Sequence, residues 1–526
     1  MSTVPRKGFL AWVERTGNKL PDPVFIFLYL IAGLILVSLI AAAAGWSAPH
    51  PTELGPDGQK KLIEAQSLLS GDNLRRLFVE MPTTFTHFHP LGYVLVVMLG
   101  AGVAERSGLF AAAMKAGVRR APKGLLTPAV ALVAMVSNHA ADAAYVVLIP
   151  LAGTLYAAAG RHPLAGIAAA FAGVSGGFSA NIAPGQLDAL LFGITQTSAN
   201  TLVPEYHANI AGNWYFIVAL TVLYLPIIWW VTDKVIEPRL GAWSNAVIDE
   251  AHHGDPARER RALRWAGVGS LVVVGLWVLF TLGPGTPLID EAACPDAKML
   301  AGECSAQAQL TPLYRSLVAA FLFLFLIAGW VYGKVSGSIK DHRDLIKMLT
   351  DSMKDLGYYL VLAFVAAHFV AMFNWSNLGL ISAVHGADAI NNSGLPMPIV
   401  LGLIVLFSAA INLFVGSASA KWALLAPVLV PMLMLLGLSP EAATAAYRVG
   451  DSATNIITPL MVYFPLILVF CQRWQKDFGL GSLTATMLPY SLWLLIGGLV
   501  LMVAWVFIGV DLGPGAPVDY VLPAGR

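Results

Sequence analysis

Charged residues are scarce in this chain of 526 residues, because Asp, Glu, Lys and Arg together make up only 12% of it. Average soluble domains contain roughly 25% charged residues. Hydrophobic residues reach 57%, so too little polar surface remains to coat a soluble protein of this length. The formal net charge of +1 argues against nucleic acid as a partner. The composition therefore predicts an all-α polytopic membrane protein that forms a single membrane-embedded domain over 1–526.

Cysteine is also rare, since the chain contains three, and none has the spacing of a metal site. We therefore expect no cofactor and no firm metal site, apart from sodium or a proton as a coupling ion. The chain lacks a G-x-x-x-x-G-K-[ST] loop, so it is not expected to hydrolyse a nucleotide. Transport would then be driven by an ion gradient or run passively.

Long apolar segments dominate the sequence. The first, near 24–45, is longer than the apolar core of a signal peptide, about 7 to 15 residues, so we interpret it as a retained span. Windows of about 19 residues predict nine transmembrane helices, near 24–45, 91–114, 164–194, 213–232, 265–282, 313–333, 357–374, 442–470 and 487–509.

Two further apolar stretches, 124–160 and 398–437, are interrupted by small polar residues. Basic residues flank the first on both sides, whereas the segments around the second, 375–397 and 438–441, lack Lys and Arg. Because cytoplasmic loops are rich in Lys and Arg, each stretch should return to the side it entered from, and the two should enter from opposite sides. The first leg has about 13 residues, fewer than the roughly 17 to 25 that a span needs. We therefore predict two opposed re-entrant helical hairpins.

This arrangement places most of the 32 Lys and Arg residues on the cytoplasmic side. The N-terminus is then inside and the C-terminus outside. The loop 283–312 lies outside, where a disulfide between Cys294 and Cys304 is permitted. Whether these two cysteines pair is left open by the sequence.

The passages that follow the two interruptions resemble each other. In each, two prolines thirteen residues apart precede an Asn-Ile step and another proline: Pro150, Pro163, Asn181 and Pro184 in the first, and Pro427, Pro440, Asn455 and Pro459 in the second. We therefore predict an inverted-topology repeat with cores at 124–194 and 398–470. Discontinuous membrane helices of this kind build the binding sites of secondary transporters, because unwound backbone is tolerated at membrane depth only where it lines a cavity or is buried in protein.

Ionisable residues inside the predicted spans and hairpin tips are candidates for function, since each costs a few kcal/mol at the midplane unless it is paired or hydrated. They are Glu105, Arg106, Asp142, Asp188, Lys421, Arg448 and Asp451. Arg448 and Asp451 are three residues apart and should share one helix face. We interpret them as one unit, in which Arg448 binds a substrate carboxylate and Asp451 a coupling cation or proton. A structural ion pair between helices is the alternative.

The first repeat contains the counterpart of this unit, Asp188. Asp142 is either a cation ligand or a cap of the second hairpin leg. Asn138, Asn181 and Asn455 offer amide oxygens of the kind that hard cations accept, although buried asparagines also bond free backbone at helix breaks.

Two residues at the tip of the second hairpin have alternative roles. Lys421 either neutralises an anionic ligand or extends its amine to water. Trp422 either stacks on an aromatic ligand or anchors at a membrane interface. Glu105 and Arg106 are adjacent and point to different faces of a helix, so we expect them to be structural.

Two other classes of protein are less consistent with the sequence. Gly173–Gly177 matches the nucleophile pattern G-x-S-x-G, for which His139 or His368 would be the base of an intramembrane hydrolase. Spans rich in Gly and Ala produce such matches readily, because small residues let helices pack closely, so we predict no enzymatic activity. An anion channel would not require a discontinuous inverted repeat.

Several segments, in order along the whole chain, resemble the p-aminobenzoyl-glutamate transporter (AbgT) family. They are Trp12–Pro21, Leu99–Leu109, Gly160–Pro163, Asp233–Gly241, Phe369–Asn377, Leu425–Val428 and Arg448–Ser452. The resemblance implies a homodimeric inner-membrane transporter with nine spans and two opposed re-entrant hairpins. It also implies uptake of p-aminobenzoyl-glutamate or efflux of sulfonamide antimetabolites, coupled to sodium or protons.

Carried over by motif, the resemblance implies substrate-binding roles for Asp188, Ser419, Trp422, Pro440, Arg448, Asp451 and Pro459. The run Pro184–Leu187 differs from the more hydroxyl-rich run expected before Asp188. The candidates for binding the coupling cation are Asp142, Asn138, Asn181, Asn455 and Asp451.

Together these observations predict a cation-coupled secondary transporter in the bacterial inner membrane that moves p-aminobenzoyl-glutamate or a similar small aromatic anion by alternating access. An aromatic amide with two carboxylates requires a cation such as Arg448 and a ring platform such as Trp422. Export of sulfonamides by the same fold is the alternative, and the sequence does not decide the direction of transport.

Overall fold

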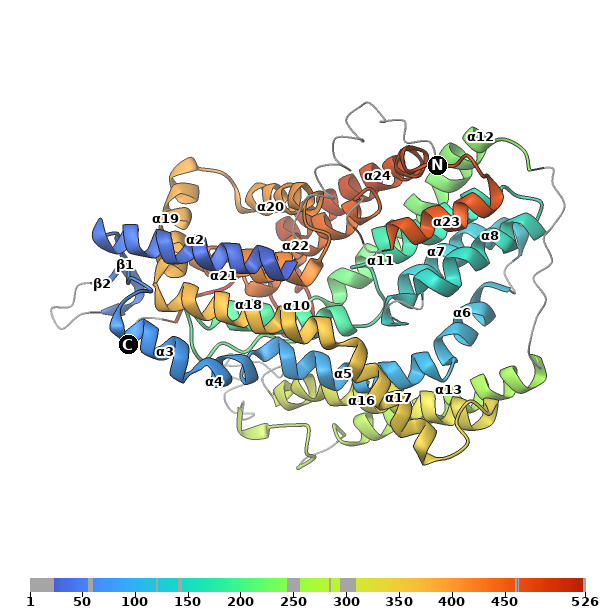
Figure 1. Ribbon diagram of the computed structural model, residues 1–526, viewed down its shortest axis with the longest axis horizontal. Helices are drawn as coiled ribbons and strands as arrows, with labels where there is room; N and C mark the ends of the chain where they lie inside the picture. Colours follow the sequence, from blue (N-terminus) through green and yellow to red (C-terminus); the bar gives the residue numbers. More distant parts are fainter. Residues whose placement is uncertain are drawn as a thin grey trace.

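The computed structural model of the chain is built almost wholly from helices (Figure 1). It describes residues 23–54, 60–119, 122–140, 144–243, 256–282, 285–293, 309–458, 461 and 463–523. Cys294 and Cys304 lie outside these described residues, so the predicted pairing stays open. Apolar segments fold into helices here because a helix satisfies its own backbone hydrogen bonds, which lipid cannot do.

The helices of the first half are α2 (Pro23–Ala43), α3 (Gly71–Val79), α4 (Met81–Thr86), α5 (His89–Arg106), α6 (Leu109–Arg119), α7 (Leu126–Val136), α8 (Ile149–Ala158), α9 (Pro163–Phe171), α10 (Gln186–Ala199), α11 (Trp214–Trp230), α12 (Glu237–Leu240) and α13 (Pro256–Leu279). Those of the second half are α16 (Thr311–Ser336), α17 (His342–Asp355), α18 (Gly357–Trp375), α19 (Leu378–Ser393), α20 (Met397–Asn412), α21 (Ala418–Leu435), α22 (Pro440–Asn455), α23 (Phe464–Trp474) and α24 (Leu480–Ile508).

Shorter turns connect some of these helices. They are the 3-10 turns η1 (Lys123–Leu125), η2 (Ser137–Ala140) and η6 (Glu291–Ala293) and the π-helical turns η3 (Ala144–Leu148), η4 (Ala172–Gly176) and η5 (Val231–Ile236). The turn η5 joins α11 to α12, so one helical segment continues from Trp214 to Leu240.

The described residues contain seven continuous helices that are long and apolar enough to cross a membrane, or eight when a bent pair is included. The bent pair is the predicted span 91–114, in which α5 and α6 meet at 67°. The seven include α21, which we assigned to a hairpin and not to a span. The count of nine spans and the re-entrant nature of the hairpins therefore stay predictions.

Two of the predicted spans, 164–194 and 442–470, are not continuous helices. The first is interrupted between η4 and α10, a segment that contains Gly177 and Pro184, two residue types that disfavour regular helix. The second is interrupted between α22 and α23. Each interruption contains or adjoins an Asn-Ile step. This step, which occurs in both predicted repeat cores, therefore marks a helix break in each of them.

The two hairpins have the same packing scheme. The legs of the first, α7 and α8, both pack against α9, and the legs of the second, α20 and α21, both pack against α22. In each broken span, the helix after the break packs against the other predicted repeat core. Helix α10 contacts α21 and α22, and helix α23 contacts α8 and α9. This exchange interlocks the two predicted repeat cores, which form the middle of the molecule in Figure 1.

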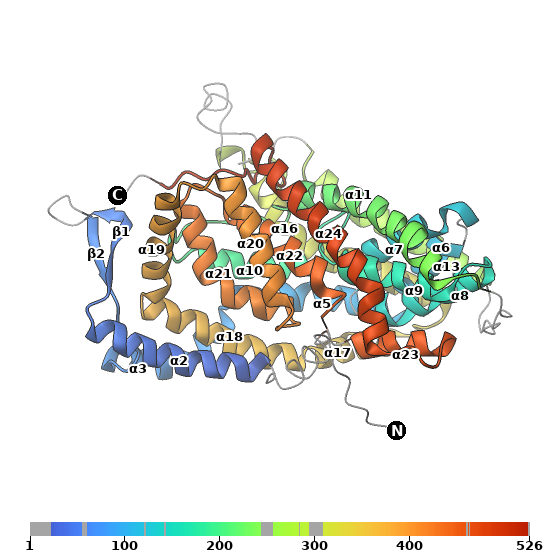
Figure 2. The same cartoon turned by 90° about the horizontal axis from the view of Figure 1, so that it is seen from above.

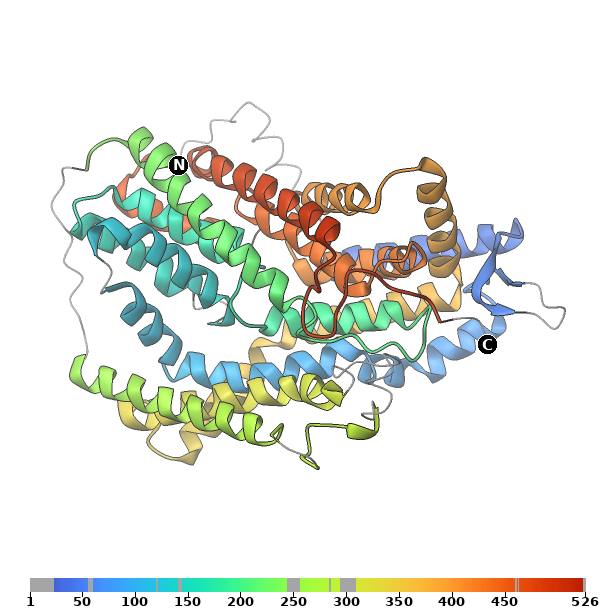
Figure 3. The same ribbon diagram turned by 180° about the vertical axis from the view of Figure 1, so that it is seen from behind.

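Other helices lie around this centre. The helices α13, α16 and α5 pack as a layer, with α17 against α5, in the lower part of Figure 1. On another side α2 lies along α18 (Figure 2), where the rings of Phe27 and Phe369 meet edge to face with centroids 5.6 Å apart. In Figure 3 the segments that follow α10 and α24 run close together, joined by a hydrogen bond from the Asn209 side chain to the carbonyl of Pro514.

Several elements were not predicted from the sequence. Strands β1 (Ser47–Leu54) and β2 (Lys60–Glu64) form an antiparallel hairpin, and α3, α4, α17 and α19 occupy segments that we treated as loops. These elements are short or polar, and the hydropathy windows searched only for long apolar segments.

An ion-pair network anchors the end of the first hairpin. Arg161 follows α8 and pairs with both Asp233 and Glu237, and it also donates to Thr127 of α7 at 2.9 Å. The Arg161 guanidinium lies over the ring of Tyr156, 4.5 Å from its centroid. Both hairpin legs are thereby tied to the end of α11.

The helices α20 and α22 approach so closely that only glycine fits at Gly450. A Cβ atom there would lie 2.7 Å from the backbone nitrogen of Ala409 and 2.8 Å from Cβ of Ser408. Small residues at such crossings allow the close packing on which membrane helix association depends.

We expect Gly450→Ala to destabilise the protein by about 1–3 kcal/mol, because the added methyl forces α20 and α22 apart. Thermal unfolding in detergent, followed by tryptophan fluorescence, would measure this as a lower melting temperature. Gly275→Ala in α13 is the matched control, since nothing lies within 4 Å of its added Cβ. Equal melting temperatures for the two variants would contradict the packing argument.

Candidate functional site

Five of the predicted site residues gather where α10 meets α21 and α22: Asp188, Lys421, Trp422, Arg448 and Asp451. Ser417 caps α21, accepting from the amide of Ala420 at 3.3 Å, and Ser439 caps α22, accepting from the amide of Ala442 at 3.2 Å. Pro440 occupies the first turn of α22, where its missing N–H leaves no donor unsatisfied. These caps fix where the two helices start, and therefore which side chains face α10.

An ion pair between Asp188 and Arg448 joins the two repeats. Arg448 Nη1 lies 2.6 Å from Asp188 Oδ1, and the side chains are only 2% and 7% exposed. Asp188 lies in the first turn of α10, where its other oxygen accepts from the amide of Gly185 at 2.7 Å. Arg448 Nη1 also lies 3.5 Å from Oδ1 of Asn213, and Arg448 Nε is buried without a hydrogen-bond partner.

Asp451 pairs with a different residue. Its carboxylate forms an ion pair with Lys421, and the two side chains are 2% and 0% exposed. Our interpretation of Arg448 and Asp451 as one unit was therefore wrong: they share a helix, but each binds an oppositely charged residue of another element. Lys421 does not extend to water, which was one of its two predicted alternatives. Residues brought by tertiary packing outcompete the weak local pairing at a spacing of three.

Asn412, at the end of α20, connects the Lys421–Asp451 pair to the break after α22. Its amide nitrogen donates to the Asp451 carbonyl at 2.6 Å, to Thr454 Oγ1 at 2.9 Å and to Asn455 Oδ1 at 2.8 Å. Its amide oxygen accepts from Lys421 Nζ. Asn455, a predicted cation ligand, thus uses its oxygen on Asn412.

Trp422 is fully buried, which excludes a position at the membrane interface. Its ring stacks on that of Tyr447 with centroids 4.5 Å apart, and its indole N–H donates to Thr195 Oγ1 of α10 at 2.9 Å. The face that we expected to hold an aromatic ligand is therefore covered by Tyr447 in this conformation.

The remaining predicted residues occupy different surroundings. Ser419 is half-buried at a small cavity between α10, α18 and α21, and Pro440 is buried in the first turn of α22. Asn138 donates to the carbonyl of Gly177 at 3.2 Å, and Asn181 accepts from the amide of Ile182 at 2.9 Å. Both asparagines therefore bond backbone freed by the helix break. Asp142 and Pro459 lie outside the described residues.

Sequence reasoning missed two polar residues beside the site. Glu441 is buried and accepts from the Tyr206 hydroxyl at 2.7 Å, and Asn412 binds the Lys421–Asp451 pair as described above. Glu441 directly follows Pro440. The predicted span 442–470 begins after Glu441, so the sequence placed this residue in an outer loop, whereas α22 already begins at Pro440. Asn412 is an uncharged polar residue inside an apolar hairpin leg. It was missed because the criterion for candidates in this leg, the cost of burying charge, applies only to ionisable residues.

A small cavity of about 20 Å³ adjoins the Asp188–Arg448 pair and is also lined by Thr195, Glu441 and Thr444. It shares Phe192, Ala208, Asn209 and Ile210 with a larger cavity of about 270 Å³. We call the larger cavity the vestibule; the predicted topology places it on the outer side.

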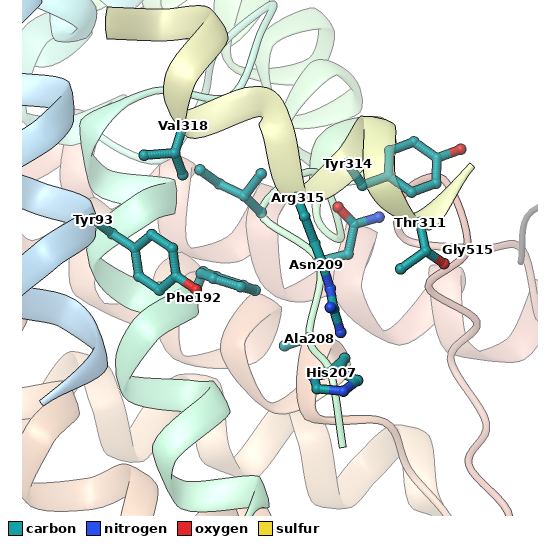
Figure 4. A pocket seen from close by; sticks show the side chains of 11 residues that line it. Tyr93, Phe192, His207, Ala208, Asn209, Thr311, Tyr314, Arg315, Val318 and Gly515 are labelled. Atoms are coloured by element: carbon teal, nitrogen blue, oxygen red, sulfur yellow. The ribbon is translucent and has the colours of Figure 1, made fainter. Parts of the chain in front are cut away.

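The vestibule is lined by aromatic rings and by Arg315 of α16 (Figure 4). The rings of Tyr93 and Phe192 meet edge to face with centroids 5.2 Å apart. Partial burial, and then the neighbouring Arg315, lower the pKa of His207 below its usual value. His207 is therefore mostly neutral at neutral pH, and Arg315 supplies the positive charge of the vestibule.

The hydrolase alternative is not supported by the geometry. Ser175 lies on η4 with its hydroxyl 3.2 Å from the sulfur of Met461, whereas His139 and His368 bond to backbone carbonyls of Pro184 and Phe364. The described residues contain no group of three or more His, Cys, Asp or Glu side chains that could hold a metal ion. What the arrangement offers instead is two buried ion pairs, one of which, Asp188–Arg448, lies beside a cavity.

We expect Asp188→Asn to destabilise the protein by about 3–5 kcal/mol, because it leaves the buried Arg448 without a counter-charge. The double variant Asp188→Asn with Arg448→Gln should regain part of this loss, since no unpaired charge remains. Chemical denaturation in detergent would measure both. Asp72→Asn is the control, because Asp72 is 89% exposed; a single variant as stable as this control would refute the argument.

Comparison with known proteins gives matches over nearly the whole chain. The sequence model of the "AbgT putative transporter family" matches residues 8–520. The chain is 35% identical over 520 residues to the p-aminobenzoyl-glutamate transport protein of Escherichia coli K12, covering 98% of each chain. It is also 33% identical to the putative basic amino acid antiporter YfcC of the same organism, but over only 88 residues, 16% of this chain and 17% of that protein.

Two solved structures are similar to the fold. The YdaH transporter of Alcanivorax borkumensis has a TM-score of 0.82 and 42% identity, over 94% of this chain and 100% of that one. MtrF of Neisseria gonorrhoeae has a TM-score of 0.86 and 40% identity, over 98% of this chain and 100% of that one, and its structure is described as illuminating a class of antimetabolite efflux pumps. Because the family model matches residues 8–520 and the Escherichia coli relative is 35% identical over 98% of each chain, this chain belongs to the AbgT family of transporters.

Proposed function

We propose that this protein is a cation-coupled secondary transporter that moves p-aminobenzoyl-glutamate, or a similar small aromatic anion, across the bacterial inner membrane by alternating access. The observation that carries the proposal is the buried Asp188–Arg448 pair beside a cavity that joins the vestibule. We expect the protein to be a homodimer with a cytoplasmic N-terminus and a periplasmic C-terminus.

Arg448 is suited to bind a substrate carboxylate. A guanidinium forms two parallel hydrogen bonds with a carboxylate, and here only one guanidinium nitrogen, Nη1, donates to Asp188, while Nε is buried without a partner. A substrate carboxylate can therefore add to Arg448 or replace Asp188. Either event alters the contact between α10 and α22, which belong to different repeat cores.

This contact provides a physical link between binding and conformational change. When a substrate carboxylate takes over Arg448, Asp188 loses its counter-charge and, unless water hydrates it, must be neutralised by a proton or a metal cation. The same rule holds for Asp451 whenever Lys421 is displaced. Movement of the anion is thereby coupled to movement of a cation, which is the basis for proposing secondary transport.

The size of the cavities supports an alternating mechanism. The cavity at Arg448, about 20 Å³, is far below the roughly 300–1,000 Å³ typical of ligand sites, and the Trp422 face is covered by Tyr447. Binding of the aromatic ring therefore requires Tyr447 or the second hairpin to move. The conformation described here is one in which the vestibule reaches the site but the site has not opened to its full size.

Export of sulfonamide antimetabolites is the second candidate, and the specific observation for it is the similarity to MtrF, which reaches a TM-score of 0.86. Sulfonamides share the aromatic amine of p-aminobenzoyl-glutamate but lack its two carboxylates. Their binding would therefore depend more on Trp422 and less on Arg448. Comparing the two ligands in an Arg448 variant separates the two functions.

Purified protein in lipid vesicles should transport p-aminobenzoyl-glutamate in response to an imposed sodium or proton gradient. We expect Arg448→Lys to reduce kcat/KM by roughly tenfold or more, because lysine loses the bidentate geometry. Asp451→Ala should abolish the response to the gradient. Flux that ignores every imposed gradient would refute coupling, and wild-type flux in the Asp451 variant would remove Asp451 from the mechanism.

Arg315 should raise the rate of substrate capture through its charge in the vestibule. We expect Arg315→Gln to raise KM several-fold with little change in the maximal rate, and the effect should shrink at high ionic strength because the charge is exposed to solvent. Arg315→Lys keeps the charge and is the control. An unchanged KM at low salt would show that the vestibule charge has no part in uptake.

A further inference from the structure

The ammonium group of Lys421 occupies a position where a coupling metal cation would be expected to bind. Lys421 lies in the first turn of α21, and its side chain is fully buried. Its nitrogen contacts Asp451 of α22 and the amide oxygen of Asn412 of α20. A carboxylate and an amide oxygen are ligands that hard cations accept, and both point at the lysine.

The orientation of Asn412 is fixed by its other contacts. Its amide nitrogen lies 2.6 Å from the Asp451 carbonyl, 2.9 Å from Thr454 Oγ1 and 2.8 Å from Asn455 Oδ1. These three acceptors hold the amide nitrogen on the α22 side, so the amide oxygen must face Lys421. The oxygens around the lysine are therefore arranged to hold a positive charge.

Charge balance makes Lys421 and a metal cation mutually exclusive. Among the described residues, the ionisable groups that face Lys421 from α20, α21 and α22 are Asp451, which pairs with it, and Tyr447, whose hydroxyl lies 3.3 Å from Asp451. Arg448 is on the same helix but is paired with Asp188. Two like charges this close repel strongly inside a protein, where the effective dielectric constant is far below that of water, so Na⁺ binds Asp451 only after Lys421 has left.

From this geometry we propose that Lys421 is a tethered cation: its ammonium group fills the place of a metal ion between Asp451 and Asn412 and thereby excludes Na⁺ from it. The proposal rests on the proposed function and states which cation this site does not take.

A structural role is the competing explanation, since a buried ion pair could simply hold α21 against α22. The two differ in what happens when the lysine is removed. A structural pair predicts loss of stability alone. A tethered cation predicts that the vacated oxygens of Asp451 and Asn412 become available to Na⁺, which is a gain of binding that a purely structural role would not produce.

The test is a comparison of sodium responses in detergent and in vesicles. Melting temperatures are measured in NaCl and in choline chloride of equal ionic strength, for the wild type, Lys421→Met, Lys421→Arg and the double variant Lys421→Met with Asp451→Asn. We expect NaCl to raise the melting temperature of Lys421→Met by several degrees, because a ligand that binds only the folded state stabilises it. The other three proteins should show no such shift, nor should Lys354→Met, a control at a lysine that is 70% exposed.

In vesicles, an imposed sodium gradient should not drive uptake by the wild type. A sodium-driven flux in the wild type would overturn the proposal, even if Lys421→Met failed to fold. So would a folded Lys421→Met protein that shows no response to NaCl. The melting experiment uses no substrate, so it stands even if p-aminobenzoyl-glutamate is not transported, and failure of the proposed function is thereby distinguished from failure of this inference.

Discussion

The central structure depends on one constraint: buried charges in a membrane protein must be paired. Helix α22 carries Arg448 and Asp451 on adjacent turns, and both are almost inaccessible to solvent. Their partners, Asp188 and Lys421, come from α10 and α21, on the other sides of chain breaks. The two ion pairs therefore hold a broken span of the first repeat core and a hairpin of the second against the same helix. Any motion of these elements must exchange one of the pairs for substrate, ion or water.

Broken helices make this pairing compatible with the membrane. Unwound backbone at membrane depth needs polar partners, and here buried amides supply them: Asn138 bonds the carbonyl of Gly177, while Asn412 bonds the carbonyl of Asp451 and the side chain of Asn455. Residues that were candidates for cation binding thus satisfy backbone in this conformation. The same polar atoms become free ligands only if the breaks rearrange, which connects ion binding to conformational change.

Much of the organisation was predictable because it follows from local sequence. Apolar length located six continuous spans: α2, α11, α13, α16, α18 and α24. For the majority of their ends, the predicted boundary lies within a few residues of the observed one. The duplicated Asn-Ile steps marked both helix breaks, although the windows had counted 164–194 and 442–470 as unbroken. Averaged hydropathy does not detect a break of a few residues inside an apolar segment. For the same reason it missed the β1–β2 hairpin and the polar helices α3 and α17.

The sequence by itself determined the membrane class and predicted which ionisable residues lie in the interior: Asp188, Lys421, Arg448 and Asp451, all of which are buried. Both follow from composition and from the high cost of placing an ionisable residue within an apolar segment. Only the tertiary structure decided which charges pair, that Tyr447 covers Trp422, and that Asn412 completes the site. The physical reason is that pairing depends on helices distant in sequence. Arg448 and Asp451 are neighbours along the chain, but the stronger contacts come from elements that only folding brings together.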